Sequence, residues 1–159
     1  MRLMMRLILI IFFFLFPILG FCQKYNTNNL AKNSIFIDCN YNPELDFYSV
    51  MYDRMLKPKG VWKIGVQTGL TLSSKVVDAN NNFAKFFPIR SYFLFGYNSH
   101  YFETNFGVKI LGVVFPEFGL GYRYKTEKGG LSFRVGYSGI MMIHGGLQNM
   151  VSLSVGYAF

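Results

Sequence analysis

The last thirteen residues of the chain, 147–159, read LQNMVSLSVGYAF and decide the fold. Every second residue toward the C-terminus is apolar: Val151, Leu153, Val155 and Tyr157. The residues between them are small or polar: Ser152, Ser154, Gly156 and Ala158. A period of two is that of a β-strand, whose successive side chains point to opposite faces. The stretch therefore predicts a strand with one apolar and one polar face.

The same period recurs along the rest of the chain. It predicts seven further strands, at residues 34–39, 46–56, 62–71, 89–97, 101–111, 117–125 and 131–142. Eight is an even number, so the first and last strands can pair antiparallel and close a barrel without an open edge. In lipid, only helices and closed barrels satisfy their backbone polar groups. We therefore predict an all-β fold, an eight-stranded antiparallel up-and-down transmembrane β-barrel. Its first strand is short for a crossing, unless it is helped by its neighbours or continues past Cys39.

The N-terminus has the pattern of an export signal. Arg2 and Arg6 precede an apolar core at residues 7–16, and Pro17 and Gly20 break its end. That apolar run is short for a spanning helix, which needs about 20 residues. We predict a cleaved signal peptide at 1–23, a flexible periplasmic lead-in at 24–33 rich in Asn and Lys, and an outer-membrane barrel at 34–159.

The charge balance limits the classes of partner. Of 16 basic residues, removal of Arg2 and Arg6 leaves 14 against 8 acidic ones, about +6 for the mature chain. These charges are spread along the strands and turns, and no nucleic-acid motif accompanies them. We expect outer-membrane lipid and lipopolysaccharide as partners, no nucleic acid, and a monomer.

Charged residues gather on one face of the predicted strands. The parity of the strands turns ten of them inward: Asp38, Asp53, Glu103 and Glu117 with Lys63, Arg90, Lys109, Arg123, Lys125 and Arg134. An eight-stranded barrel is just wide enough for side chains to fill it. We therefore expect a polar network that plugs the lumen; a narrow ion path along the basic excess is the alternative.

Aromatic residues and connection lengths give an orientation. Tyrosines and the tryptophan lie mostly near strand ends, as an interfacial girdle requires: Tyr48, Trp62, Tyr97, Tyr122, Tyr124 and Tyr157. The short turns at 57–60, 98–100 and 126–130 are predicted to face the periplasm. The outer connections are then 40–46, 73–87, 112–116 and 143–147, of which only 73–87 is long.

Candidate catalytic or metal-binding groups are few. Cys22 leaves with the signal, so Cys39 is alone and no disulfide framework is expected. Ser138 and His144 lie near the outer rim, where a serine with a histidine could serve nucleophilic catalysis. No third, orienting acid is identifiable. We predict no catalytic residue, no metal site and no cofactor.

Several segments resemble a known family. These are SIFID at Ser34, SVMYDR at Ser49, FPIRSYFLFG at Phe87, GYRYK at Gly121, GGLSFRVGYS at Gly129 and LSVGYAF at Leu153. They are similar to small, mostly uncharacterised outer-membrane β-barrel proteins of Gram-negative bacteria, over nearly all of the mature chain. Tyr157 and the terminal Phe159 resemble the signal by which the barrel-assembly machinery recognises such proteins. Met51 departs from the pattern, because a polar inward residue is expected there, which implies a drier patch of lumen.

The sequence thus predicts a non-enzymatic integral outer-membrane barrel with a structural or envelope-interaction role. Three alternatives remain open: a lipid-modifying outer-membrane enzyme, a narrow ion channel and a soluble lipocalin-like carrier. The carrier would place the apolar face inside and polar residues outside.

Overall fold

The computed structural model describes residues 31–57, 61–77, 83–126, 128–142 and 146–159. These residues form eight strands: β1 (Asn33–Tyr41), β2 (Asp46–Lys57), β3 (Trp62–Val77), β4 (Phe83–Tyr97), β5 (His100–Leu111), β6 (Val113–Lys125), β7 (Gly130–Met142) and β8 (Gly146–Ala158). The predicted signal peptide and all but the last three residues of the predicted lead-in lie outside the described residues.

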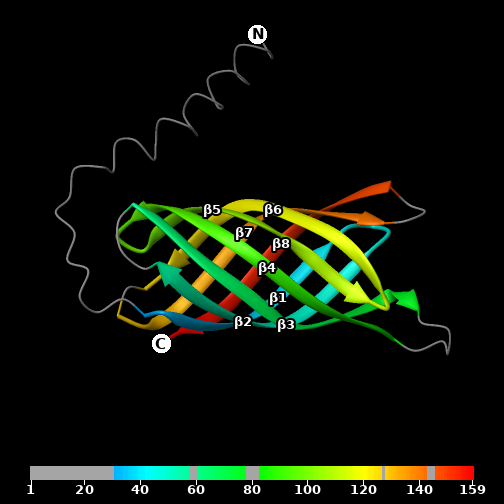
Figure 1. Cartoon of the computed structure of the whole chain (residues 1–159), viewed down its shortest axis with the longest axis horizontal. Helices are drawn as coiled ribbons and strands as arrows, with labels where there is room; N and C mark the ends of the chain where they lie inside the picture. The colour runs from blue at the N-terminus through cyan, green and yellow to red at the C-terminus, as the bar shows by residue number, and fades with distance from the viewer. Residues whose placement is uncertain (1–30, 58–60, 78–82, 127, 143–145) are drawn as a thin grey trace, which may run out of the picture.

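The strands close into one antiparallel barrel in sequence order, β1 to β8 (Figure 1). Closure joins β1 to β8, with a register that runs from Ser34 opposite Ala158 to Tyr41 opposite Val151. The predicted fold class is therefore confirmed. The first strand extends past Cys39 to Tyr41, which gives it 9 residues, enough for a tilted crossing of a bilayer.

Two predicted connections are wrong in extent. The region 73–87 is not one long loop, because β3 continues to Val77 and β4 begins at Phe83, with Ser73 paired to Ala84. The polar centre of that prediction, residues 78–82, lies outside the described residues. The first residues of β4 alternate as a strand does, because Ala84 and Phe86 turn inward and are fully buried. The polar residues before them obscure this alternation in the sequence. The reversal expected at 112–116 is also wrong, because β6 starts at Val113 directly after Gly112.

Gly112 makes that reversal possible. Its φ is 65°, in the left-handed region that glycine adopts without steric cost. At the opposite end of the barrel, Asn98 and Ser99 form the β4–β5 turn with φ values of 46° and 75°. Positive φ at both central residues is the mark of a type I′ turn, whose twist matches that of the flanking strands.

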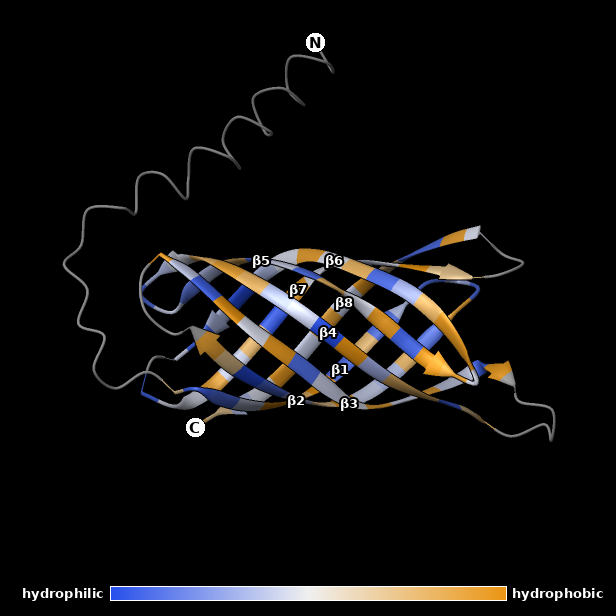
Figure 2. Cartoon of the chain, viewed as in Figure 1, coloured by the Kyte–Doolittle hydropathy of each residue, from blue (hydrophilic) through white to orange (hydrophobic). Residues whose placement is uncertain are grey.

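The two faces of the barrel wall differ in polarity. Figure 2 shows apolar and polar residues alternating along the strands. Large apolar side chains are exposed on the outside, including Val151, Leu153, Val155 and Tyr157 of β8 at 52–65% exposure. Among the described residues, no helix is both long and apolar enough to cross a membrane, a finding that does not bear on strands.

The Asp46 side chain satisfies the unpaired backbone N–H groups along one edge of the β3–β4 hairpin. The β2–β3 ladder ends at Tyr48 opposite Leu72, so the last residues of β3 have no strand beside them on that side. The Asp46 carboxylate takes the place of a strand: it accepts hydrogen bonds from the backbone N–H groups of Ser74 (2.9 Å) and Lys75 (3.2 Å). The Ser73 hydroxyl donates to it as well, at 3.2 Å.

Replacing Asp46 with alanine is expected to open this edge. The amide protons of Ser74 and Lys75 should exchange with solvent faster, and the free energy of unfolding should fall by about 1.5–3 kcal/mol, the range for hydrogen bonds to charged groups. Hydrogen exchange followed by mass spectrometry measures the first effect. Glu44→Ala is the matched control, because Glu44 is an exposed acid two residues away. Equal exchange rates in the two variants would contradict this account.

Candidate functional site

The ten charged residues predicted to face inward are all buried. Their exposure is at most 5%: Asp38, Asp53, Lys63, Arg90, Glu103, Lys109, Glu117, Arg123, Lys125 and Arg134. Burial places them inside the barrel, since the exposed residues of the same strands are mostly apolar. Asp46, the first residue of β2, is an eleventh buried charge among the described residues.

Nine of the ten form one continuous chain in which bases and acids alternate. We call it the ion-pair chain; in order it contains Lys109, Glu117, Arg90, Asp38, Arg134, Glu103, Arg123, Asp53 and Lys125. Each acid therefore lies between two bases. The tenth residue, Lys63, donates from Nζ to the Tyr101 hydroxyl at 3.0 Å.

The half of the chain nearer the β1–β2 turn is centred on Arg90. Glu117 lies 3.3 Å from Lys109 Nζ and 2.5 Å from Arg90 Nε. Arg90 also pairs through Nη2 with the second oxygen of Glu117, at 3.0 Å, so the contact is bidentate. Its Nη1 lies 3.1 Å from Asp38, and Asp38 lies 2.5 Å from Arg134. Bidentate guanidinium–carboxylate pairs fix geometry as well as charge.

The other half of the chain is centred on Arg123, which is fully buried. Glu103 joins the halves, 3.0 Å from Arg134 and 2.5 Å from Arg123. Arg123 Nη1 lies 2.5 Å from Asp53, and its guanidinium also stacks 4.6 Å from the centre of the Tyr92 ring. Tyr92 donates its hydroxyl proton to Asp53 at 2.9 Å.

Every strand contributes to this network. The ion-pair chain draws on β1, β2, β4, β5, β6 and β7. Arg134 adds the remaining two, because it donates to Gln67 of β3 at 3.3 Å and to Ser154 of β8 at 3.0 Å. A buried ion pair costs desolvation, and extra hydrogen bonds of this kind are needed to offset it. The network thus links strands across the lumen that share no backbone ladder.

An apolar cluster fills the lumen beyond the Lys109 end of the chain. We call it the outer cluster; it consists of Leu45, Phe47, Ala84, Phe86, Ile140 and Met150. Phe47 and Phe86 meet edge to face at 5.4 Å between ring centres. Lys109 Nζ lies 3.9 Å from the centre of the Phe47 ring, a cation–π contact that joins the two layers.

The outer cluster is not among the sequence predictions. All its members except Leu45, which precedes β2, continue the inward parity of their strands, but the predicted network contains only polar inward residues. Ala84 and Phe86 also fall within the connection predicted at 73–87. The signal that could have found the cluster is the run of large apolar residues at inward positions near strand ends, such as Phe47, Ile140 and Met150.

A second cluster lies at the opposite end of the lumen. This inner cluster contains Met55, Tyr92, Leu94 and Tyr101, all at most 3% exposed. The ion-pair chain is therefore bounded by packed side chains on both sides. Within the network, a small cavity of about 20 Å³ borders Asn40, Arg90 and Glu117, which is room for about one water molecule.

Comparisons with known proteins support the architecture. No protein-family model matches the chain, and no curated protein matches its sequence. The structure is similar to the N-terminal β-barrel domain of OprF from Pseudomonas aeruginosa, with a TM-score of 0.63 and 13% identity over 83% of this chain and all of that one. It is also similar to the Yersinia pestis outer membrane protein Ail in a phospholipid bilayer nanodisc, with a TM-score of 0.51 and 13% identity over 81% of this chain and 99% of that one. At these identities the likeness shows the fold.

Of the two residues considered for nucleophilic catalysis, only Ser138 lies among the described residues. Ser138 is hydrogen-bonded through Oγ to Asn40 Oδ1 at 3.0 Å, whereas His144 lies outside the described residues. Among the residues that the structure describes, no three or more His, Cys, Asp or Glu side chains gather as they would around a metal ion. Met51, predicted to dry one part of the lumen, is fully buried.

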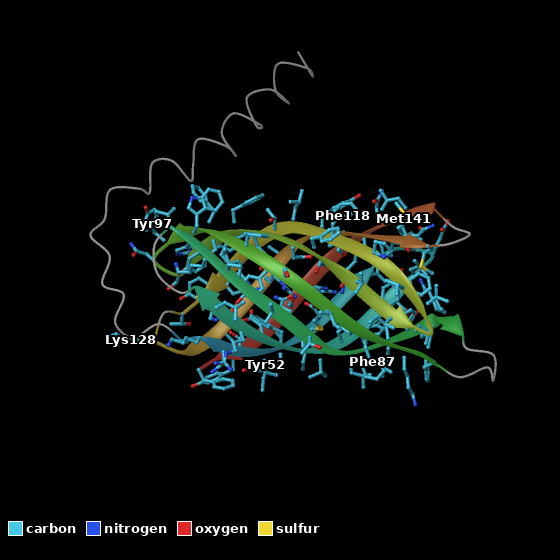
Figure 3. The ribbon with its side chains drawn as sticks, viewed as in Figure 1. Tyr52, Phe87, Tyr97, Phe118, Lys128 and Met141 are labelled. Carbon is cyan, nitrogen blue, oxygen red and sulfur yellow. The ribbon has the colours of Figure 1, made fainter. Side chains whose placement is uncertain are left out.

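Aromatic contacts on the outer surface concentrate at the end of the barrel that carries the C-terminus. Figure 3 shows Tyr97 and Lys128 toward that end, with Phe118 and Met141 toward the other. Trp62 packs on Phe95 with 4.6 Å between ring centres, and Tyr124 stacks on Phe133 at 5.2 Å. Tyr48, which is 50% exposed, starts the outward face of β2 near the opposite end.

The two residues of the predicted assembly signal lie at the closing strand. Tyr157 and Phe159 turn their side chains outward, with 61% and 52% exposure. The Phe159 backbone also exchanges two hydrogen bonds of 2.9 Å with Asn33, one in each direction. The terminal residue thus completes the seam between β8 and β1.

Proposed function

We propose that the protein is a non-enzymatic integral outer-membrane barrel with a filled lumen and a structural or envelope-interaction role. One observation carries the proposal: the charges are inside and the apolar side chains are outside. A soluble barrel would have the reverse arrangement. Of the two similar structures, Ail is named as an outer membrane protein, which supports the same location.

The extent of the apolar surface, which covers the outward face of all eight strands, supports a lipid environment. Exposed Leu, Ile, Val, Phe, Trp and Tyr side chains occur on the outward face of all eight strands, for example Ile37, Val66 and Phe106 at 58%, 41% and 66%. Soluble monomers rarely expose a continuous apolar surface of more than a few hundred Å². Heat-modifiable migration in detergent together with membrane fractionation tests this; recovery of the chain as a soluble periplasmic protein without a migration shift would refute it.

A filled lumen accounts for the interior better than an ion path does. Each acid of the ion-pair chain lies between two bases within the barrel, and the outer and inner clusters cover the chain at both ends. An aqueous path would have to pass between Phe47, Phe86 and Ile140, which are fully buried. Buried apolar packing of this kind excludes water.

We therefore expect no stable single-channel conductance from the purified protein in planar bilayers. Phe86→Gly is expected to open a space in the outer cluster without creating a continuous path, because the ion-pair chain and the inner cluster still close the lumen. Conductance steps that depend on the folded barrel, whether in the unaltered protein or in Phe86→Gly, would favour the channel alternative and contradict the filled lumen.

The enzyme alternative has little support among the described residues. Ser138 pairs with an amide and not with a base, and a nucleophilic serine needs an adjacent general base. Replacing His144 with alanine and analysing lipid A by mass spectrometry tests the enzyme alternative further. Altered lipid A would identify an enzyme.

Removing Phe159 is expected to impair barrel assembly more than any change in a connection. The deletion removes two backbone hydrogen bonds from the β8–β1 seam together with the terminal aromatic ring. The heat-modifiable fraction of the membrane-bound protein measures assembly. Phe159→Ala separates the two roles, because it keeps the backbone bonds and removes only the ring. Normal assembly of the deletion variant would contradict both roles.

A further inference from the structure

The ion-pair chain carries one more positive charge than negative charge. It begins and ends with a lysine, so it contains five bases and four acids. All nine residues are at most 5% exposed. A buried charge without compensation is expensive, because the protein interior replaces little of the solvation that water provides. A compensating negative charge is therefore expected close to the chain.

The surplus charge can be located by comparing the two ends. Lys109 Nζ lies 3.3 Å from Glu117 and 3.9 Å from the centre of the Phe47 ring. Lys125 Nζ is 4.0 Å from Asp53 and has no hydrogen-bond partner among the described residues. The carboxylate of Asp53 already accepts from Arg123 and Tyr92 at 2.5 and 2.9 Å. The uncompensated charge therefore lies at the Lys125 end.

Further donors without acceptors surround the same carboxylate. Among the described residues, Arg123 Nη2, Gln67 Nε2 and Ser34 Oγ are buried and have no hydrogen-bond partner. Arg123 pairs with Asp53 directly. Ser34 and Gln67 lie opposite Asp53 in the registers of β1 and β3 with β2. Buried polar atoms in proteins normally have a partner, which can be a protein group, an ordered water molecule or a bound ion.

Small residues line the barrel wall beside Lys125. Ser132 lies opposite Lys125 in the β6–β7 register, and Ala158 lies opposite both Gly130 of β7 and Ser34 of β1. Ser34, Ser132 and Ala158 are fully buried. Short side chains therefore lie beside Lys125 on the neighbouring strands, whereas the large rings of Phe47 and Phe86 lie at the other end of the lumen.

We propose that a monovalent inorganic anion of the halide class binds between Lys125 Nζ and Arg123 Nη2, within reach of the Ser34 hydroxyl. One negative charge equals the surplus of the chain, whereas a divalent anion would exceed it. A halide needs only donors, and donors are what this site offers. A water molecule would bring no charge, so it would leave the surplus positive charge of the ion-pair chain in place.

Crystals of the protein grown with bromide as the halide test the proposal by anomalous scattering at the bromine edge. The expected result is an anomalous peak in contact with Lys125 Nζ. Lys125→Met should abolish this peak. Lys63→Met is the matched control and should retain it, because Lys63 is an equally buried lysine that bonds to Tyr101 and lies outside the chain. Electron density at Lys125 without an anomalous signal would identify water and overturn the proposal.

Thermal unfolding in detergent gives a second readout that does not depend on the variants crystallising. At equal ionic strength, the melting temperature should be higher in sodium chloride or bromide than in sodium gluconate, whose anion is too large for the site. The difference should vanish in Lys125→Met and persist in Lys63→Met. Equal melting temperatures of the unaltered protein in all three salts, or a difference that persists in Lys125→Met, would overturn the proposal.

Discussion

Replacing Arg123 with methionine is expected to lower the free energy of unfolding by about 3–5 kcal/mol, the cost of breaking a buried ion pair from one side. Methionine keeps most of the packing volume but leaves Asp53 and Glu103 without their shared base, at 0% and 1% exposure. Urea unfolding of the folded barrel in detergent, followed by tryptophan fluorescence, measures the loss.

Arg54→Met is the control for this prediction. Arg54 belongs to β2, as Asp53 does, but its side chain is exposed, and such surface changes stay within about 0.5 kcal/mol. A second variant separates charge from packing: adding Asp53→Asn and Glu103→Gln to Arg123→Met should recover part of the loss, because the abandoned acids become neutral. If Arg123→Met and Arg54→Met destabilise equally, the ion-pair chain has no role in stability.

The second large effect is expected on the outer face. Leu153→Arg, near the middle of β8, should destabilise the inserted barrel by about 2–4 kcal/mol, the cost of an arginine at the bilayer midplane. Leu131→Arg, at the start of β7, should cost about 0–1 kcal/mol, because near an interface the guanidinium reaches water. The two leucines are 59% and 60% exposed, so depth in the membrane is the main difference between them.

Unfolding of both variants in lipid bilayers, compared with unfolding in detergent micelles, checks this prediction. A soluble barrel would tolerate arginine at both exposed positions, since each would reach water. Similar small costs at Leu153 and Leu131 in bilayers would therefore argue against a transmembrane barrel.

The sequence was sufficient for the fold because a period of two carries over directly into a two-faced wall. Residues such as Leu153 and Ser154 differ in polarity, so a shift of one residue would place every side chain on the wrong face. The same parity placed Asp38 and Arg134 on the inner face. It could not show that they pair at 2.5 Å, because these residues lie 96 positions apart in the chain and pair only after closure.

The sequence was less informative where inward residues are apolar. Phe86 and Ile140 have the same polarity as lipid-facing residues, so the pattern loses its contrast near the strand ends and does not reveal the outer cluster. The extension of β3 is hidden for a related reason. Its last residues include Ser73, Ser74 and Lys75, which are typical of a loop until Asp46 is seen to accept their hydrogen bonds.

The central claim is that the apolar face of each strand meets lipid and the charged face fills the lumen. Spin labels placed one at a time along residues 151–157, in a chain whose Cys22 and Cys39 are replaced by serine, test it most directly in bilayers. Accessibility to oxygen, which concentrates in lipid, should alternate with a period of two and be high at Val151, Leu153 and Val155 and low at Ser152 and Ser154. High accessibility of Leu153 to a water-soluble nickel reagent, with no enrichment of oxygen, would contradict the claim.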